Sequence, residues 1–400
     1  MNVPLSCPDI SQREIDYVNR VLTTNVLSIG PVQREFEEKF AAYVGTRYAV
    51  AVSSGTAALH LCVRALGIGS QDEVLTTSFS FVASANCLRY EGALPLFVDI
   101  DSETLNIDPE VIREFIRRHC EFDRNSASLI DKRTGRRVKA ILPVHVFGLP
   151  CDMNAILEIA HEYGMYIIED ACEAIGAEYR GWRVGGFGEV AAFAFYPNKQ
   201  MTTAEGGMVV TNDEKVARLC RSMRNQGRGD DPSWLEHVRL GYNYRLSELH
   251  CALGLAQLER IEELLTAREK AAAAYTQELS GHPLIVPPHA AAEPKRSWFV
   301  YVVQVNGPSL LRDRILIRLR EHGIGCQAYF PAVHRQPYFG ESDLKYQQPL
   351  PRTERAAGRC LALPFFSRIT KEQIDFVCNT LLEVVEEESA TQLLESVPFR

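Results

Sequence analysis

The sequence predicts an α/β fold built on a mainly parallel sheet. Short apolar runs alternate with helical runs as far as Asp170, and turn-forming residues separate them. The runs YAVAV at Tyr48–Val52 and MYIIE at Met165–Glu169 are almost continuously apolar, with no alternation of polar residues. Strands with this pattern are buried on both faces, because helices cover both sides of a parallel sheet.

Capping residues and helix breakers locate the first helices. Ser11 and Glu14 have the spacing of a capping box, which predicts a helix running toward Leu22. Pro31 suits the first turn of a second helix, and Gly45 ends it. The further elements expected in this part are, in chain order, the strand 48–52, the helix 55–66, the strand 73–77, the helix 79–90, the strand 94–99, the helix 111–119, the strand 138–146, the helix 153–163 and the strand 165–169.

The pattern changes after Asp213. Leu246–Leu279 has a long helical pattern that can bridge two domains, and the proline-rich segment His282–Pro294 is typical of a connector. The elements expected beyond it are a strand at 298–305 and helices at 314–322 and 371–386, the last with Thr370 as its N-cap. We therefore predict a large domain over residues 1–255 and a smaller α+β domain over residues 256–400.

Two segments depart from this pattern. Glu121–Arg137 interrupts the alternation of strands and helices, which indicates a surface insertion, with a hairpin as one possible form. The polar tail Glu387–Arg400 is expected to be peripheral to the fold.

The composition argues against several classes of protein. The chain has 400 residues and a net charge of −8, so a basic nucleic-acid-binding surface is not expected. No apolar run approaches the ~18 residues that span a bilayer, and the first residues lack the features of a secretory signal. The eleven cysteines form no C-x-x-C pair and the histidines show no zinc spacing. We expect free thiols, no bound metal and a cytoplasmic location.

The segment SSGTAAL at Ser53–Leu59 follows a strand and opens a helix. Small residues at such a turn expose backbone N–H groups, and the helix N-terminus adds positive potential. The segment is therefore a candidate phosphate cradle, although it has neither the Walker pattern nor the G-x-G-x-x-G pattern. A turn of small residues chosen only for strand–helix packing is the alternative.

Two carboxylates, Glu169 and Asp170, end a predicted strand. The carboxyl ends of parallel strands are where α/β folds bind their ligands. A cofactor with a pyridinium nitrogen needs an anionic partner of this kind to stay protonated. The alternative is an aspartate that only caps a helix.

Lys199 lies between two apolar strands in the segment Ala192–Asp213, and a turn containing Glu205, Gly206 and Gly207 follows it. A lysine that leaves an apolar strand toward such a turn is a candidate nucleophile for a carbonyl cofactor. A lysine at the exposed tip of a loop is the alternative. The cradle, the aspartate and the lysine in this order are far more specific than any one of them.

Longer motifs make a family resemblance explicit. They are SGTAAL, FVDID at 97–101, PVHVFG at 143–148, EDACEAIGAEYRG at 169–181, NKQMTTAEGG at 198–207 and GYNYR at 241–245. Together they resemble the DegT/DnrJ/StrS family of nucleotide-sugar aminotransferases, which depend on pyridoxal 5′-phosphate (PLP). The resemblance runs from about Ser28 to Phe339. It implies the aspartate-aminotransferase-like fold of PLP fold type I, a three-layer large domain with a smaller α+β domain.

The resemblance also implies roles for single residues. Lys199 matches the lysine that binds the cofactor covalently and then acts as general acid and base. Asp170 matches the aspartate on the pyridine nitrogen, and Phe81 the aromatic residue that stacks on the ring, with a core phenylalanine as its alternative. Glu173 and four other residues also match cofactor-binding positions of the family. Of these, Gly55, Thr56 and Ala57 match the phosphate cradle, and Asn243 matches a residue that reaches the phosphate of the neighbouring subunit. A homodimer with shared active sites follows from this assignment of Asn243.

Two positions distinguish this chain within the family. Many members carry serine at the position of Ala194, where its hydroxyl contacts the phosphate. Many carry glutamine or histidine at the position of Glu173, and a glutamate there resembles the perosamine-synthase branch. Lys199 argues against a dehydratase branch in which histidine replaces the lysine.

The substrate residues are less specific. The segment YFPAVHRQPYF at Tyr329–Phe339 resembles a loop that closes on the sugar nucleotide, which makes Tyr329 and His334 candidates for substrate contact. Packing within the loop is the alternative for both. Arg245 is a candidate for the substrate diphosphate or the donor carboxylate, because guanidinium geometry suits both, and a structural salt bridge is the alternative.

The function implied is transfer of an amino group from L-glutamate to a keto-sugar nucleotide, at C4 of a GDP-linked 4-keto-6-deoxy sugar, for surface polysaccharide synthesis. The alternatives are a UDP- or dTDP-linked ketosugar or a cyclitol in antibiotic or glycan synthesis. From a different class, a PLP-binding regulatory protein without turnover also remains. No membrane or nucleic-acid partner is expected.

Overall fold

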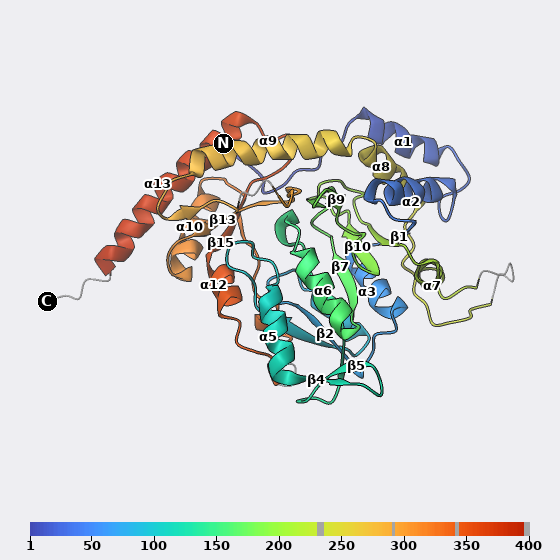
Figure 1. Cartoon of the computed structure of the whole chain (residues 1–400). Helices are drawn as coiled ribbons and strands as arrows, with labels where there is room; N and C mark the ends of the chain where they lie inside the picture. The colour runs from blue at the N-terminus through green and yellow to red at the C-terminus, as the bar shows by residue number, and fades with distance from the viewer. Residues whose placement is uncertain (230–235, 290–292, 341–343, 396–400) are drawn as a thin grey trace.

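The computed structural model describes residues 1–229, 236–289, 293–340 and 344–395. Its larger part is built on a nine-stranded sheet, counted over these residues (Figure 1). The strands along its main path are, in spatial order, β1 (Tyr48–Val52), β11 (Gly207–Thr211), β10 (Val190–Ala194), β7 (Tyr166–Asp170), β6 (Arg137–Leu142), β2 (Asp72–Thr77) and β3 (Leu94–Val98). β10, β7, β6, β2 and β3 pair in parallel, and β1 and β11 close one end in antiparallel pairing. The predicted mainly parallel sheet is confirmed.

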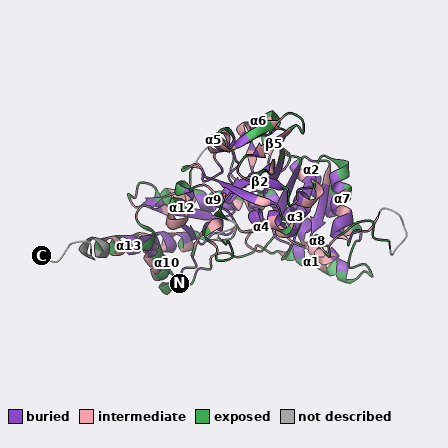
Figure 2. Cartoon of the chain, turned by 90° about the horizontal axis from the view of Figure 1, so that it is seen from below, coloured by how far each residue is buried: buried purple, intermediate pink, exposed green. Residues whose placement is uncertain are grey.

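Helices cover both faces of this sheet, which gives three layers. The helices of the larger part are α1 (Gln12–Leu22), α2 (Pro31–Val44), α3 (Gly55–Ala65), α4 (Ala83–Tyr90), α5 (Pro109–His119), α6 (Met153–Tyr163), α7 (Glu214–Arg224) and α8 (Glu248–Leu258). Residues of α3, α4 and α7 share one buried apolar cluster with the sheet, whereas α2 and α8, and α5 and α6, pack on the opposite face. The strands between them are buried on both sides (Figure 2).

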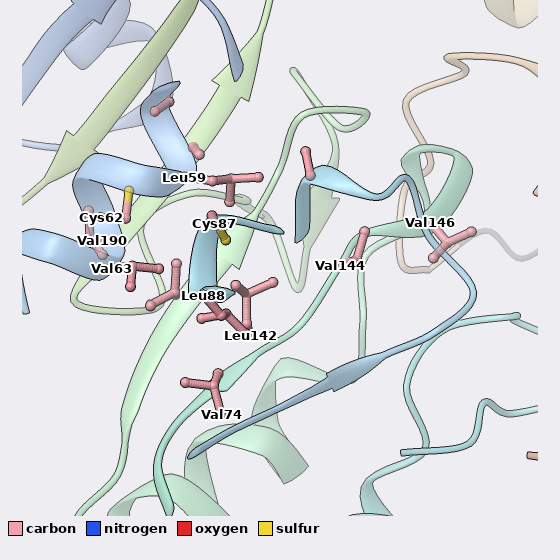
Figure 3. Packing of buried hydrophobic residues seen from close by; sticks show 14 of the residues in the cluster. Leu59, Cys62, Val63, Val74, Cys87, Leu88, Leu142, Val144, Val146 and Val190 are labelled. Atoms are coloured by element: carbon pink, nitrogen blue, oxygen red, sulfur yellow. The ribbon is translucent and has the colours of Figure 1, made fainter. Parts of the chain in front are cut away.

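Strand alternation explains how one short strand serves two cores. In β1, Val50 and Val52 belong to the cluster under α3, while Ala49 and Ala51 belong to the cluster under α2. Successive side chains of a strand point to opposite faces, so a strand covered on both sides must be apolar at every position. Figure 3 shows the first cluster, where Leu59 of α3 and Leu88 of α4 lie over the sheet.

Local capping places most helix ends where the sequence predicts them. Ser11 and Glu14 form the expected capping box of α1, and Gly45 ends α2 in the left-handed region with φ of 90°. One helix begins later than predicted: α4 starts at Ala83 and not at Phe79. The Ser80 hydroxyl is engaged with Ser84 at 2.7 Å, and residues 79–82 form a loop before the helix.

The smaller part contains a four-stranded antiparallel sheet in the order β12 (Ile285–Val286), β13 (Tyr301–Val305), β15 (Cys360–Leu363) and β14 (Gln327–Ala328). Its helices are α9 (Ile261–Leu279), α10 (Ser309–Glu321), α12 (Pro351–Arg359) and α13 (Lys371–Glu395). The expected helix 246–279 is two helices, α8 and α9, and α9 runs from the larger part to the smaller (Figure 1). Val3 pairs with Ile324 and belongs to the core of the smaller part. The division at residue 255 stays a prediction.

Short elements complete the chain. They are the turns of 3-10 helix η1 (Val146–Gly148) and η2 (Val333–Arg335), and the two-stranded sheet of β8 (Glu178–Tyr179) and β9 (Trp182–Arg183). The strand predicted to reach Val146 therefore ends at Leu142, and the strand expected from Trp298 begins at Tyr301. The segment 387–395, expected as part of a peripheral tail, continues α13, and Glu387 and Glu388 pair with Arg318. Residues 396–400 of that tail lie outside the described residues.

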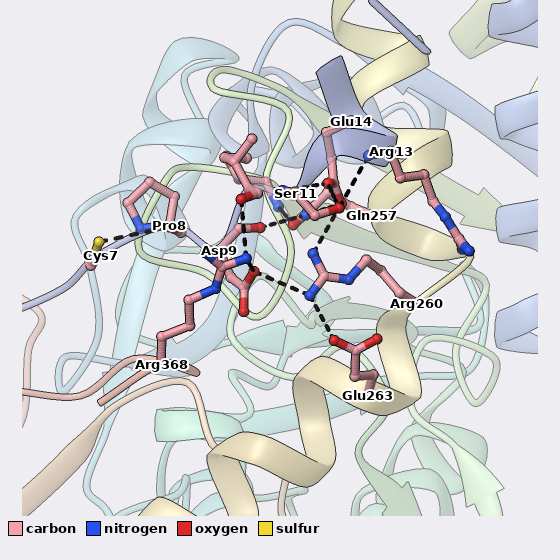
Figure 4. A network of polar contacts seen from close by, with 12 residues as sticks. Cys7, Pro8, Asp9, Ser11, Arg13, Glu14, Gln257, Arg260, Glu263 and Arg368 are labelled. Atoms are coloured by element: carbon pink, nitrogen blue, oxygen red, sulfur yellow. Dashed lines mark hydrogen bonds and ion pairs between the residues drawn. The ribbon is translucent and has the colours of Figure 1, made fainter. Parts of the chain in front are cut away.

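A polar network anchors the N-terminal segment to both parts (Figure 4). Asp9 pairs with Arg260 at 3.1 Å and with Arg368 at 2.6 Å, while Gln257 donates to Glu14 at 2.8 Å. Burial opposes ionisation of Glu14, but hydrogen bonds from Ser11 and Gln257 outweigh it and lower its pKa to about 2. The network ties the start of α1 to the α8–α9 junction.

The insertion takes the form of a hairpin, one possibility that the sequence left open, from β4 (Cys120–Asp123) and β5 (Ser128–Asp131), and β5 also pairs with β6. Glu73 of β2 is fully buried, and neither of its carboxyl oxygens has a hydrogen-bond partner among the described residues. Burial raises the pKa of this carboxyl to about 7 and Asp131 adds to the effect, although the Thr134 side chain and two nearby arginines act to lower it. Ionisation of this carboxyl therefore lowers the stability of the folded protein as the pH rises.

We predict that the wild-type protein loses stability as the pH rises from about 4.5 to 7 and that Glu73→Gln does not. In this window the unfolded chain ionises Glu73 while the folded chain keeps it protonated, so the free energy of unfolding falls as pH rises. The full loss is about 3 kcal/mol from the shift of the pKa. Thermal unfolding of wild type and variant across pH 4–8.5 measures it. Glu121→Gln, on the exposed side of the hairpin, is the control, and parallel pH profiles for wild type and Glu73→Gln would contradict the prediction.

Candidate active site

A pocket of about 430 Å³ lies at the carboxyl end of β7, beside the N-terminus of α3. The larger part supplies most of its wall, and Phe299, Tyr329 and Phe330 from the smaller part complete it. The pocket brings together these residues predicted from the sequence: Gly55, Thr56, Phe81, Asp170, Glu173, Lys199 and Tyr329. The carboxyl ends of parallel strands are the expected ligand position in an α/β sheet.

Close backbone contacts shape the N-terminus of α3. Ser54 is the N-cap, and its hydroxyl accepts the N–H of Ala57 at 3.1 Å. A Cβ on Gly55 would lie 2.6 Å from the Cβ of Ala194, and a Cβ on Gly207 would lie 2.4 Å from the carbonyl oxygen of Ser54. Only glycine fits at both positions. The free N–H groups of the first turn and its positive potential fit the phosphate of a bound cofactor.

Asp170 and Glu169 point to opposite faces of the sheet because they are neighbours in a strand. Asp170 lines the pocket, is 5% exposed, and accepts hydrogen bonds from the Ser84 hydroxyl at 2.6 Å and the Cys172 N–H at 3.1 Å. These contacts hold a carboxylate at the base of the pocket, where it fits a pyridinium nitrogen.

Glu169 is fully buried away from the pocket and holds two loops. It accepts the N–H groups of Gly185, Phe187 and Gly188 at 2.7–2.9 Å. His145 accepts the Cys151 N–H at Nδ1, so its Nε2 carries the proton and donates to Glu169 at 3.2 Å. The carboxylate is therefore structural, and it fixes the strand end that carries Asp170.

Lys199 lies on the turn between β10 and β11, and its side chain is mostly buried. The Nζ atom lies 3.9 Å from the centroid of the Phe299 ring and 3.8 Å from a carboxyl oxygen of Glu173. An amine held between an aromatic face and one carboxyl is placed for reaction in a largely apolar wall. The alternative of a lysine at an exposed loop tip does not match this position.

Glu173 carries a perturbed carboxyl beside the lysine. Burial raises its pKa to about 7, although the nearby Lys199 and a hydrogen bond from the Phe147 N–H, at 2.9 Å, both act to lower it. The carboxyl therefore changes its charge near neutral pH, within reach of the amine.

Two aromatic side chains lie open at the pocket. Phe81 is 60% exposed and Tyr196 is 52% exposed, and both line the cavity. Phe81 precedes α4 and is not a core residue of that helix, which leaves its ring free to stack on a flat ligand.

Sequence reasoning missed several residues of this site. Tyr196, Asn198 and Phe299 line the pocket, and Ser84 binds Asp170. Tyr196 and Asn198 could have been found from their closeness to Lys199 in the chain. Nothing local marks Ser84 or Phe299, because each reaches the site through the fold.

Four predicted residues do not line this pocket. Ala57 lies one residue deeper in α3, and Asn243 is exposed on a segment whose backbone pairs with Asn225. Arg245 donates to the Asn225 side chain at 3.1 Å and lines a separate cavity. His334 bonds the Ser78 hydroxyl at 2.7 Å and faces Glu354 at 3.3 Å, which matches the loop-packing alternative for this side chain.

The fold and the pocket define a PLP-dependent aminotransferase. The chain belongs to the DegT/DnrJ/EryC1/StrS aminotransferase family, whose model matches residues 8–382. It is 38% identical to the GDP-perosamine synthase of Caulobacter vibrioides, over 96% of this chain and 98% of that protein.

Solved structures agree with this membership. Helicobacter pylori PseC, an aminotransferase involved in the biosynthesis of pseudoaminic acid, has a TM-score of 0.87 and 27% identity, over 97% of this chain and 100% of that one. S. venezuelae DesV, solved in complex with a ketimine intermediate, has a TM-score of 0.84 and 32% identity, over 96% of this chain and 99% of that one. The resemblance to the family, the fold class and the dependence on PLP are confirmed. No described helix is both long and apolar enough to span a membrane.

We predict that Glu173 controls the pH dependence of the reaction with the amino donor. Its carboxyl ionises near pH 7, and the carboxylate then stabilises the positive charge that Lys199 gains on accepting a proton from the donor, so the rate of the half-reaction with an amino-acid donor should rise between pH 6 and 8. Stopped-flow absorbance of the PLP-loaded protein measures this rate. In Glu173→Gln the rise across pH 7 should disappear, whereas Glu205→Gln, at the exposed edge of the pocket, should keep it. A rise that persists in Glu173→Gln would refute the assignment.

Proposed function

We propose that this sugar aminotransferase transfers the amino group of L-glutamate to C4 of a GDP-linked 4-keto-6-deoxy sugar, for a surface polysaccharide. Glu173 carries the proposal: it lies 3.8 Å from Lys199, and a glutamate at this position resembles the perosamine-synthase branch. The GDP-perosamine synthase among the relatives supports the same choice.

Each residue of the pocket is proposed to have a separate role in the reaction. PLP, when bound, supplies the electron sink that stabilises negative charge on the reacting carbon. Asp170 would keep the ring nitrogen protonated, and the first turn of α3 would hold the phosphate. Phe81 would stack on the ring face. Lys199 would hold the cofactor and, with its free amine, would accept and return the proton of the substrate carbon, as general base and general acid in turn.

A second group of residues, outside the pocket, is proposed to bind the nucleotide part of the substrate. Arg245, with Arg221, Arg224 and Arg228, lines a cavity of about 190 Å³ near the segment that carries Asn243. The Arg224 guanidinium is already paired with Glu37, but the other arginines add positive charge to this cavity, which suits a diphosphate. We propose that a homodimer brings Asn243 to the cofactor phosphate, and Arg245 to the substrate diphosphate, of the partner subunit. This arrangement would explain why neither residue lines the pocket of its own chain.

The first test is the absorbance spectrum of the PLP-loaded protein with L-glutamate and no sugar. We predict that the visible band of the bound cofactor is lost and that 2-oxoglutarate forms in equal amount. Lys199→Ala should bind PLP yet lose at least about a thousandfold in the rate, because both the covalent link and the proton carrier are gone. An unchanged spectrum would point to another donor or to a non-catalytic PLP protein, and turnover by Lys199→Ala would contradict the role of the lysine.

The second test compares nucleotides. GDP-, UDP- and dTDP-linked 4-keto-6-deoxy sugars are offered to the aminated enzyme, and kcat/KM is measured for each. We expect the GDP sugar to be preferred and Arg245→Ala to raise KM for it by about tenfold or more through loss of a charged hydrogen bond. Arg13→Ala, an exposed arginine of α1, is the control. Preference for a UDP or dTDP sugar, or for a cyclitol ketone, would replace the proposed substrate.

A further inference from the structure

Arg268 of α9 is a buried cation outside the pocket. Its side chain is 2% exposed, and its guanidinium donates to three backbone carbonyl oxygens. The distances are 2.9 Å to Lys199, 3.1 Å to Phe299 and 3.4 Å to Trp298. One side chain therefore joins the turn of the lysine to the segment that leads into β13.

The charge of Arg268 has no carboxylate partner within the described part of the chain. None of the ion pairs found there includes it, and its Nε atom has no hydrogen-bond partner. Burial lowers its pKa to about 10, although the charge of Asp9, which lies beyond ion-pair distance, acts to raise it. A buried charge without a counter-ion is costly, and an apolar side chain of similar volume would satisfy packing alone. The forked guanidinium does what an apolar group cannot: it binds several carbonyls in a fixed geometry.

Both segments that Arg268 joins reach the reactive amine. Lys199 carries the amine itself, and the Phe299 ring lies 3.9 Å from that amine. Gln200 makes a second link between the same segments, because its Nε2 donates to the carbonyl of Glu173 at 2.6 Å and to the hydroxyl of Ser297 at 3.0 Å. The relative position of lysine and ring thus depends on contacts behind the pocket.

We propose that Arg268 is a positioning residue for Lys199, holding the lysine backbone and the aromatic ring beneath its amine in one fixed arrangement. The proposal rests on the proposed role of Lys199 and extends the site to α9, which spans the two parts of the chain. Arg268 acts through Lys199 and touches neither cofactor nor substrate.

The test uses the full chain with three variants. Arg268→Met removes the donors at similar length, and Arg268→Lys keeps the charge without the fork. Arg312→Met is the matched control: Arg312 is also a buried helical arginine, 6% exposed, that donates to the carbonyls of Ala357 and Cys360. Two properties are measured for each: Tm, and the rate at which the visible band forms when PLP is added to PLP-depleted protein. Borohydride reduction and peptide mapping then identify the lysine that holds PLP.

We expect both methionine variants to lower Tm. Only Arg268→Met should slow band formation, by about tenfold or more, because a misplaced Lys199 amine attacks the aldehyde of PLP less often. Arg268→Lys should slow it to a smaller extent with Tm closer to wild type. If Arg268→Met does not fold, the rate of band formation in Arg268→Lys alone tests the proposal.

Band formation at the wild-type rate in the folded Arg268 variants, or a slowing equal to that of Arg312→Met, would overturn the proposal. The mapping separates this outcome from failure of the proposed function. If wild type attaches PLP at a residue other than Lys199, the role of the lysine is wrong, whatever Arg268 does.

Discussion

The site depends on one buried carboxylate that is not part of the pocket. Glu169 is the last residue but one of β7, and three backbone N–H groups and the His145 imidazole surround its carboxylate, so protein groups alone solvate it. Loops on two sides of the strand are thereby held at its carboxyl end. Because side chains alternate along a strand, fixing Glu169 on one face fixes Asp170 on the other, where it meets the pocket. A buried charge that lost these donors would carry a large desolvation cost, which makes the arrangement rigid.

The sequence predicts the larger part well because its signals are local. Continuous apolar strands, the capping box of Ser11 and Glu14, and the glycine after α2 each determine structure within a few residues. The order of cradle, aspartate and lysine likewise indicates the site, since the topology brings strand ends and helix starts to one edge of the sheet. These are the features on which the family resemblance also depends.

What the sequence does not predict is carried by contacts between distant segments. Ser84 meets Asp170 across 86 residues, and Arg268 meets Lys199 across 69 residues, without any local pattern to mark either. The late start of α4 has a similar cause: the Ser80 side chain bonds Ser84 within the loop, and this leaves the Phe81 ring open at the pocket. His334 is a further example: the motif predicts a substrate contact, and the fold places its ring nitrogens against Ser78 and Glu354, so its contact with the substrate stays a prediction.

PLP is proposed to bind between Asp170, Lys199 and the first turn of α3, and a crystal structure of the protein grown with PLP tests this placement most directly. We predict continuous electron density from the Lys199 side chain to the cofactor, the ring nitrogen within hydrogen-bond distance of Asp170, and the phosphate at the N-terminus of α3. A cofactor bound elsewhere, or one in this pocket whose ring nitrogen faces away from Asp170, would contradict it.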